Sequence, residues 1–105
     1  MDLTNVGEVI ATRRLHLLDD ETREIFVLIG KPRQFPDSSD YYCPFQVTGI
    51  GSGKVKYAGG VDAIQAIQLA MGMIAAELDA LNNANRGRLR WEGDERGGLG
   101  FPLPR

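Results

Sequence analysis

The sequence predicts a small α+β domain in which an antiparallel sheet packs against one long helix. Four segments between residues 8 and 58 have the alternation or the β-branched composition of strands, with turn residues between them. Apolar residues then recur at helical spacing after residue 62. The length of 105 residues and the 43% hydrophobic content suit one core and are too small for two. We therefore expect a four-stranded antiparallel meander with one long helix across one face in residues 1–85, followed by a tail in residues 86–105.

The first two strands are predicted to form a hairpin. In residues 8–18, alternation places Val9, Ala11, Leu15 and Leu17 on one face and polar side chains on the other. A short polar turn follows. Residues 24–30 are β-branched and apolar on both faces, which is typical of a central strand.

The next two strands are predicted after a loop. Residues 32–40 contain two prolines and several polar residues, so they are expected to be irregular. The third strand is placed at residues 42–50, with Pro44 near its start because proline cannot donate to a strand ladder. A glycine-rich turn at residues 51–54 leads to a short fourth strand at residues 55–58.

The helix is the clearest element. Asp62 is placed to cap its first turn, and Gln65 three residues later completes a capping box. The alanines among its residues permit close approach to a sheet. The predicted buried stripe consists of six large side chains: Ile64, Ile67, Met71, Ile74, Leu78 and Leu81.

The character of the chain changes in the tail, residues 86–105. This segment contains five arginines and five glycines, and its large apolar residues have no helical period. It is expected to be extended or disordered, although residues 89–91 are suited to joining a sheet edge. Deletion of residues 86–105 is expected to leave a folded core.

Composition narrows the classes of function. Twelve basic and fourteen acidic residues give a net charge of −2, which supplies no overall field for nucleic acid or anionic membrane. The single cysteine argues against a secreted disulfide-stabilised domain. The N-terminal residues lack the basic start and apolar run of a signal peptide, and no run of about 18 apolar residues is present. A cytoplasmic location without membrane contact is expected.

No motif in the sequence predicts a catalytic, metal or cofactor site. The glycine cluster at residues 48–55 lacks the first glycine and the hydroxyl residue of a phosphate-binding loop, so a hairpin turn explains it better. His16 and Cys43, the only histidine and the only cysteine, are too few for an ordinary zinc site. We expect no bound cofactor.

Two groups of residues are candidates for binding. Alternating arginines beside an aromatic ring suit stacking on a nucleic-acid base or docking on an acidic protein face, although the same residues could form a solubilising tail or cover the core. This first group is Arg86, Arg88, Arg90 and Trp91. A pocket between helix and sheet would instead involve the second group, Tyr41, Tyr42, Cys43 and Gln65.

One stretch resembles a known family. Cys43-Pro44-Phe45, followed by Gly60-Val61-Asp62 and by Gln65-Ala66 at the helix start, is similar to a pattern in an uncharacterised family of small bacterial single-domain proteins. The resemblance covers residues 24–81 and excludes the tail. It implies a bacterial source and a meander-plus-helix fold, and it brings no catalytic residues.

These observations favour a binding protein over an enzyme. The expected function is that of a non-enzymatic bacterial accessory protein, of immunity or regulatory type, that acts by binding another protein. The alternative is a small-molecule-binding domain or enzyme with a pocket between helix and sheet. Nucleic acid is a disfavoured partner, and the sequence leaves homodimer formation open.

Overall fold

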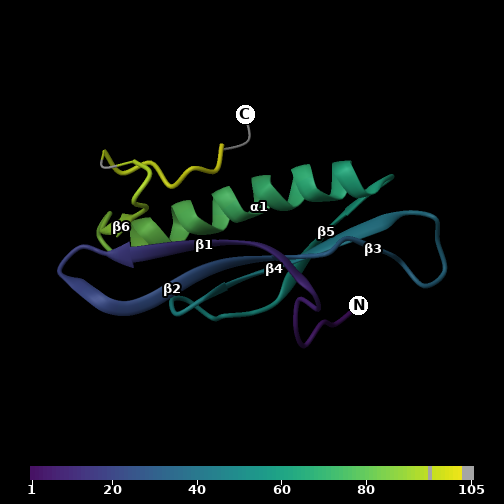
Figure 1. The fold of residues 1–105 in the computed structure, drawn as a ribbon, viewed down its shortest axis with the longest axis horizontal. Coiled ribbons are helices and arrows are strands. Elements are labelled where there is room, and N and C mark those ends of the chain that lie inside the picture. The colour runs from purple at the N-terminus through teal and green to yellow at the C-terminus, as the bar shows by residue number, and fades with distance from the viewer. Residues whose placement is uncertain (95, 103–105) are drawn as a thin grey trace.

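A computed structural model describes residues 1–94 and 96–102, which form one sheet with one helix across it (Figure 1). The elements are β1 (Val9–Leu17), β2 (Asp20–Gly30), β3 (Arg33–Gln34), β4 (Tyr41–Thr48), β5 (Lys56–Gly60), α1 (Ala63–Ala84) and β6 (Leu89–Arg90). The fold is α+β, as predicted.

The sheet is antiparallel, and its four longer strands follow the predicted meander order. β1 pairs with β2, β2 with β4, and β4 with β5. The prediction of four strands is incomplete, because the sheet has six. β3 continues the line of β2 after a short irregularity and pairs with the start of β4, while β6 joins the outer edge of β1.

The glycine cluster forms the turn between β4 and β5, as the sequence predicts. Gly49 has φ +84°, and a Cβ atom there would collide with the carbonyl oxygen of Glu24. Only glycine accommodates both the left-handed backbone and this close approach. The segment connects the two paired strands β4 and β5 as a glycine-rich hairpin loop of residues 49–55.

Helix α1 packs against β4 and β5 through most of the predicted stripe, with Ile67, Met71 and Leu81 partly buried against the core. Ile74 and Leu78 are fully buried as expected, but Ile64 is 68% exposed. Ala66 and Ala70 flank this stripe with no exposed surface, and their small side chains let the helix axis approach the sheet. The prediction failed only at Ile64, which lies in the first turn of the helix.

The start of α1 is capped as predicted. The Asp62 carboxylate accepts a hydrogen bond from the Gln65 backbone N–H at 2.7 Å. The Gln65 side chain in turn accepts one from the Val61 N–H at 2.7 Å. Asp62 thus satisfies one donor left free at the helix start, and Gln65 satisfies the N–H of Val61, the residue before the cap.

The tail is not disordered where the structure describes it, which corrects the prediction. Leu89 has no exposed surface and belongs to the same core as Leu17. Strand β6 pairs with the end of β1, and the backbone N–H of Leu18 donates to Arg88 O at 2.9 Å. Trp91, Leu99 and Phe101 pack against the core as partly buried residues. The helix returns the chain to the β1 edge, where these apolar side chains extend the core.

Helix α1 is also long and apolar enough, by length and composition alone, to cross a membrane. The search for an uninterrupted apolar run in the sequence misses this property, because glutamines interrupt the helix. Core helices of soluble proteins meet the same test, so this is weak evidence for a membrane segment. Here the helix buries Ile74 and Leu78 against the sheet.

Candidate functional site

The candidate site follows the outer edge of β1, which is paired only at its C-terminal end. β6 occupies this edge at His16 and Leu17. Because backbone groups alternate along a strand, the N–H and C=O groups of Thr12 and Arg14 face the same side as those of His16. Within the described residues no strand pairs with β1 on this side before His16. The edge is therefore an unoccupied row of hydrogen-bonding groups.

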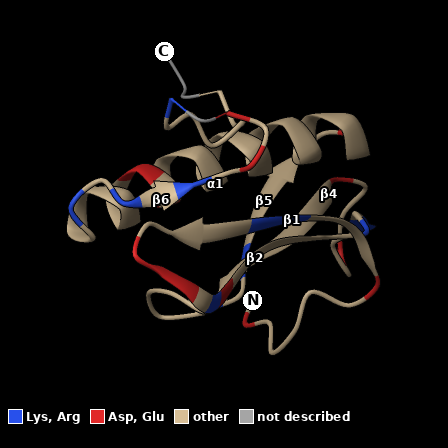
Figure 2. Cartoon of the chain, turned by 60° about the vertical axis from the view of Figure 1, so that its left-hand side comes forward, with Lys and Arg blue, Asp and Glu red and all other residues tan. Residues whose placement is uncertain are grey.

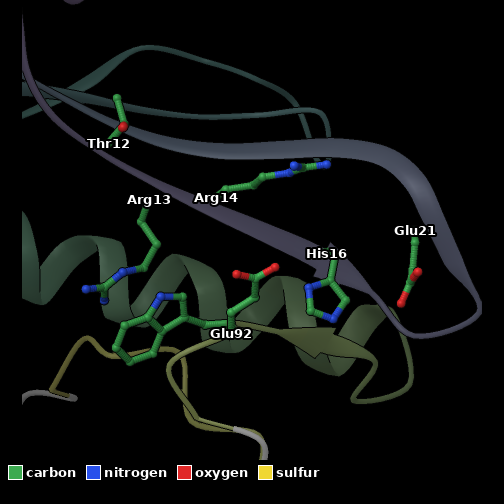
Figure 3. Close-up of a pocket in the computed structure, with 7 residues that line it drawn as sticks. Thr12, Arg13, Arg14, His16, Glu21 and Glu92 are labelled. Atoms are coloured by element: carbon green, nitrogen blue, oxygen red, sulfur yellow. The ribbon is translucent and has the colours of Figure 1, made fainter.

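A polar hollow of about 590 Å³ lies beside the second half of this edge (Figure 3). Figure 3 shows Glu92 between Arg13 and His16 along the strand, with Glu21 at the far end. The residues that line this polar hollow are Thr12, Arg13, Arg14, His16, Glu21, Trp91 and Glu92. The first half of the edge, by contrast, is apolar.

Arg13 fixes the C-terminal segment to β1. Its guanidinium lies 3.9 Å from the centre of the Trp91 ring and 4.9 Å from that of Phe101. The same group donates a hydrogen bond to Leu99 O at 3.1 Å. A cation held between two aromatic rings contributes roughly 0.5–2 kcal/mol per contact. Arg13 is therefore engaged within the chain.

An apolar hollow of about 250 Å³ continues the site along β1. It shares Thr12 and Arg13 with the polar hollow. Ile10 at its rim is 48% exposed. The remaining lining comes from β1, β2, α1 and the tail: Ala11, Val27, Ile29, Ile67, Met71, Gly100 and Phe101. The core of the protein thus opens toward solvent beside the free edge.

The ionisable side chains of the polar hollow are not paired with one another in the part of the chain that the structure describes. In residues 1–94 and 96–102 no ion pair or hydrogen bond joins Arg14, His16, Glu21 or Glu92 to another of the four. Arg14 is exposed on the opposite side of the strand from Arg13. Within the same residues no three His, Cys, Asp or Glu side chains could hold a metal ion together. These unpaired side chains can bind a charged group of a partner.

The predicted arginine–tryptophan group is divided by the fold. Arg88 Nε donates to Asn85 O at 3.1 Å, and Arg90 Nη1 donates to Gly87 O and Leu89 O, both at 2.7 Å. These contacts stabilise the turn after α1. Arg86 lies in that turn with φ +60°. Only Trp91 of the four lines the polar hollow.

The alternative pocket residues do not converge. Cys43 has no exposed surface and lies in the core, while Gln65 caps the helix. Tyr42 is on the other face of the sheet from Cys43, in an aromatic cluster with Phe35 at 5.2 Å and Tyr57 at 6.0 Å between ring centres. Tyr41 packs against the core. A hollow between helix and sheet does exist, but it is the apolar one beside β1.

The burial of Cys43 predicts that the stability of the protein depends on pH. Burial raises the pKa of its thiol from 9.0 to about 11. Between these values the unfolded chain loses the thiol proton while the folded chain keeps it, so stability falls as pH rises through this window, by at most about 1.4 kcal/mol per unit. Urea unfolding near pH 8 and near pH 10 should show a larger loss for the wild type than for Cys43→Ala. Equal losses in both proteins would contradict this account.

Apart from Trp91, sequence reasoning missed the residues that form the edge site. Arg13 interrupts the inward-facing positions of β1 between Ala11 and Leu15. A charged residue on the inner face of a strand predicts a partner that covers it, and this signal was present. The identity of the cover, Trp91, requires the path of the chain after α1.

The chain matches a known family model over most of its length. The model is described as a domain of unknown function (DUF6968) and matches residues 11–103. The match includes the stretch that carries the resemblance and also the tail, which the resemblance leaves out. Comparison with curated proteins and with solved structures gave no match. The chain, together with its C-terminal segment, belongs to the DUF6968 family of small domains.

Proposed function

We propose that this protein is a non-enzymatic binding module that takes up an extended segment of a partner protein on the free edge of β1. The observation that carries this proposal is the unpaired backbone of Thr12 and Arg14 beside two adjoining hollows. An exposed edge accepts a strand through main-chain hydrogen bonds, and neighbouring hollows select its side chains. The chain itself supplies the precedent, because β6 occupies the same edge one step further along.

The two hollows define the chemistry of the partner segment. A side chain opposite Ala11 would enter the apolar hollow between Ile67, Met71 and Phe101. A side chain opposite Arg14 would lie on the other face, next to an exposed guanidinium. Since strand positions three apart lie on opposite faces, the segment should carry an apolar residue three positions from an acidic one.

The apolar hollow, unlike the polar hollow of about 590 Å³ beside it, has a size that favours a side chain over a free metabolite. Sites for small molecules usually enclose about 300–1,000 Å³. The hollow of about 250 Å³ is smaller and opens beside the strand edge. Strand capture also suits a protein of immunity or regulatory type, because it holds a partner segment away from its other contacts.

Blocking the edge should abolish capture. Thr12→Pro removes one edge N–H and is tolerated on an edge strand, whereas Thr12→Val keeps the N–H. We expect peptides of about 12 residues, selected from a displayed random library against the wild type, to bind Thr12→Pro at least about tenfold more weakly, since main-chain bonds provide the affinity. Fluorescence anisotropy gives the dissociation constants.

Two further comparisons make the test decisive. Thr12→Val should bind the selected peptides as the wild type does. Arg14→Glu should weaken acidic peptides and strengthen variants in which the acidic residue is replaced by lysine. Equal affinity of the wild type and Thr12→Pro would overturn strand addition. If the selected peptides bound instead at the aromatic cluster of Tyr42, the binding site would lie on the other face of the sheet.

A further inference from the structure

The outward face of α1 is apolar and is not covered by the described residues. Leu69 and Met73 on this face are 49% and 43% exposed. A shallow hollow of about 600 Å³ lies over this face, between Leu69, Met73 and Pro102. Large apolar side chains gathered on one surface indicate an interaction site.

The absence of charged side chains on this face argues against partners that are recognised by their charge. Residues 63–76 contain no charged side chain, and the helix carries acidic groups only further on, at Glu77 and Asp79 (Figure 2). A helix that lies on an anionic membrane needs basic residues on its polar face, which this one lacks. A partner selected by charge would find no complement here. An equally uncharged surface of the same length fits best.

The order of residues along the face is complementary to itself. The outward stripe consists of Gln65, Leu69, Gly72, Met73, Ala76 and Ala80. A two-fold axis between Gly72 and Met73 would pair Leu69 with the Ala76 of a second antiparallel helix. It would also pair Met73 with the second Gly72, and Gln65 with the second Ala80. Each large side chain then meets a small one, as ridges fit grooves in helix packing.

We propose that α1 forms a symmetric dimer by antiparallel packing against the α1 of a second copy. A two-fold interface uses the same patch on both subunits, which this order of residues satisfies. The 22-residue helix is about 33 Å long, so its outward half supplies on the order of 500–600 Å² per copy. The total lies at the lower edge of specific interfaces, so dissociation at micromolar concentration is expected.

The pairing of Leu69 with Ala76 makes the proposal testable by charge exchange. Leu69→Glu and Ala76→Lys should each weaken dimer formation at least about tenfold, because each places an unpaired charge in the apolar centre. The double variant should recover most of the loss, since each introduced carboxylate would then face the introduced ammonium group of the other copy. Sedimentation equilibrium of the full chain over micromolar concentrations measures the association constant.

Three outcomes would overturn the dimer. The first is a wild type that remains monomeric at several hundred micromolar. The second is a double variant no better than the single ones, which excludes this antiparallel register. The third is Leu69-dependent binding to neutral lipid vesicles without self-association, which would assign the face to a membrane surface. Thr22→Glu, in an exposed part of β2, should leave the association constant unchanged, and circular dichroism confirms that each variant is folded.

Discussion

Ile74→Asp is expected to abolish cooperative folding of this protein at 25 °C. Ile74 has no exposed surface and lies on the face of α1 that covers the sheet. The substitution removes a large apolar side chain and places a carboxylate where the core offers it no partner. Together these effects cost roughly 5 kcal/mol or more, which is comparable to the whole stability of a small domain. Thermal unfolding followed by circular dichroism would lose its sigmoidal transition.

The same substitution at Ile64 is the matched control. Ile64 lies on the same helix but is 68% exposed, so Ile64→Asp should change the free energy of unfolding by less than about 1 kcal/mol. Both proteins are compared at low micromolar concentration, so that association through α1 does not contribute. If Ile74→Asp melted like the wild type, or if Ile64→Asp also unfolded, the assignment of the buried helix face would be wrong.

The contrast between Ile64 and Ile74 shows what periodicity can predict. The spacing of apolar residues identified the helix and the capping residue Asp62, because both are local properties of the chain. It did not show how far the buried part of the stripe extends. Ile67, Met71 and Leu81 pack against the core, whereas Ile64 at the helix start is exposed, and this difference depends on tertiary packing. An apolar residue also fits either a core or an interface, and spacing does not distinguish them.

The strands show the same difference between what the local sequence predicts and what depends on the tertiary fold. Alternation and turn residues placed the four longer strands in their order, because hairpins join neighbouring segments. The short strands β3 and β6 have two residues each, too few for a pattern to appear. The edge site was missed for a related reason. Arg13 and Trp91 meet only because α1 carries the chain back to β1.

Truncation after residue 85 is expected to destabilise the domain strongly, in contrast to the expectation from sequence that the tail is dispensable. The truncation removes Leu89, whose side chain is fully buried beside Leu17, and Trp91, which covers Arg13. Loss of a buried leucine alone costs about 2–5 kcal/mol, and loss of the aromatic cover adds to it. Arg13 would then face the open core without its aromatic partners. Urea unfolding should show a greatly lowered midpoint or no transition.

A second truncation separates the contributions of the C-terminal segment. A chain that ends at residue 94 keeps β6 and Trp91 but loses Leu99 and Phe101, together with the hydrogen bond from Arg13 to Leu99 O. Because Leu89 remains in the core, this chain should fold with a midpoint between those of the full chain and the chain that ends at residue 85. Identical midpoints for all three chains would mean that residues 86–102 do not contribute to the core. If the chain that ends at residue 94 were already as unstable as the shorter one, the stabilising contacts would lie at Leu99 and Phe101 rather than at β6.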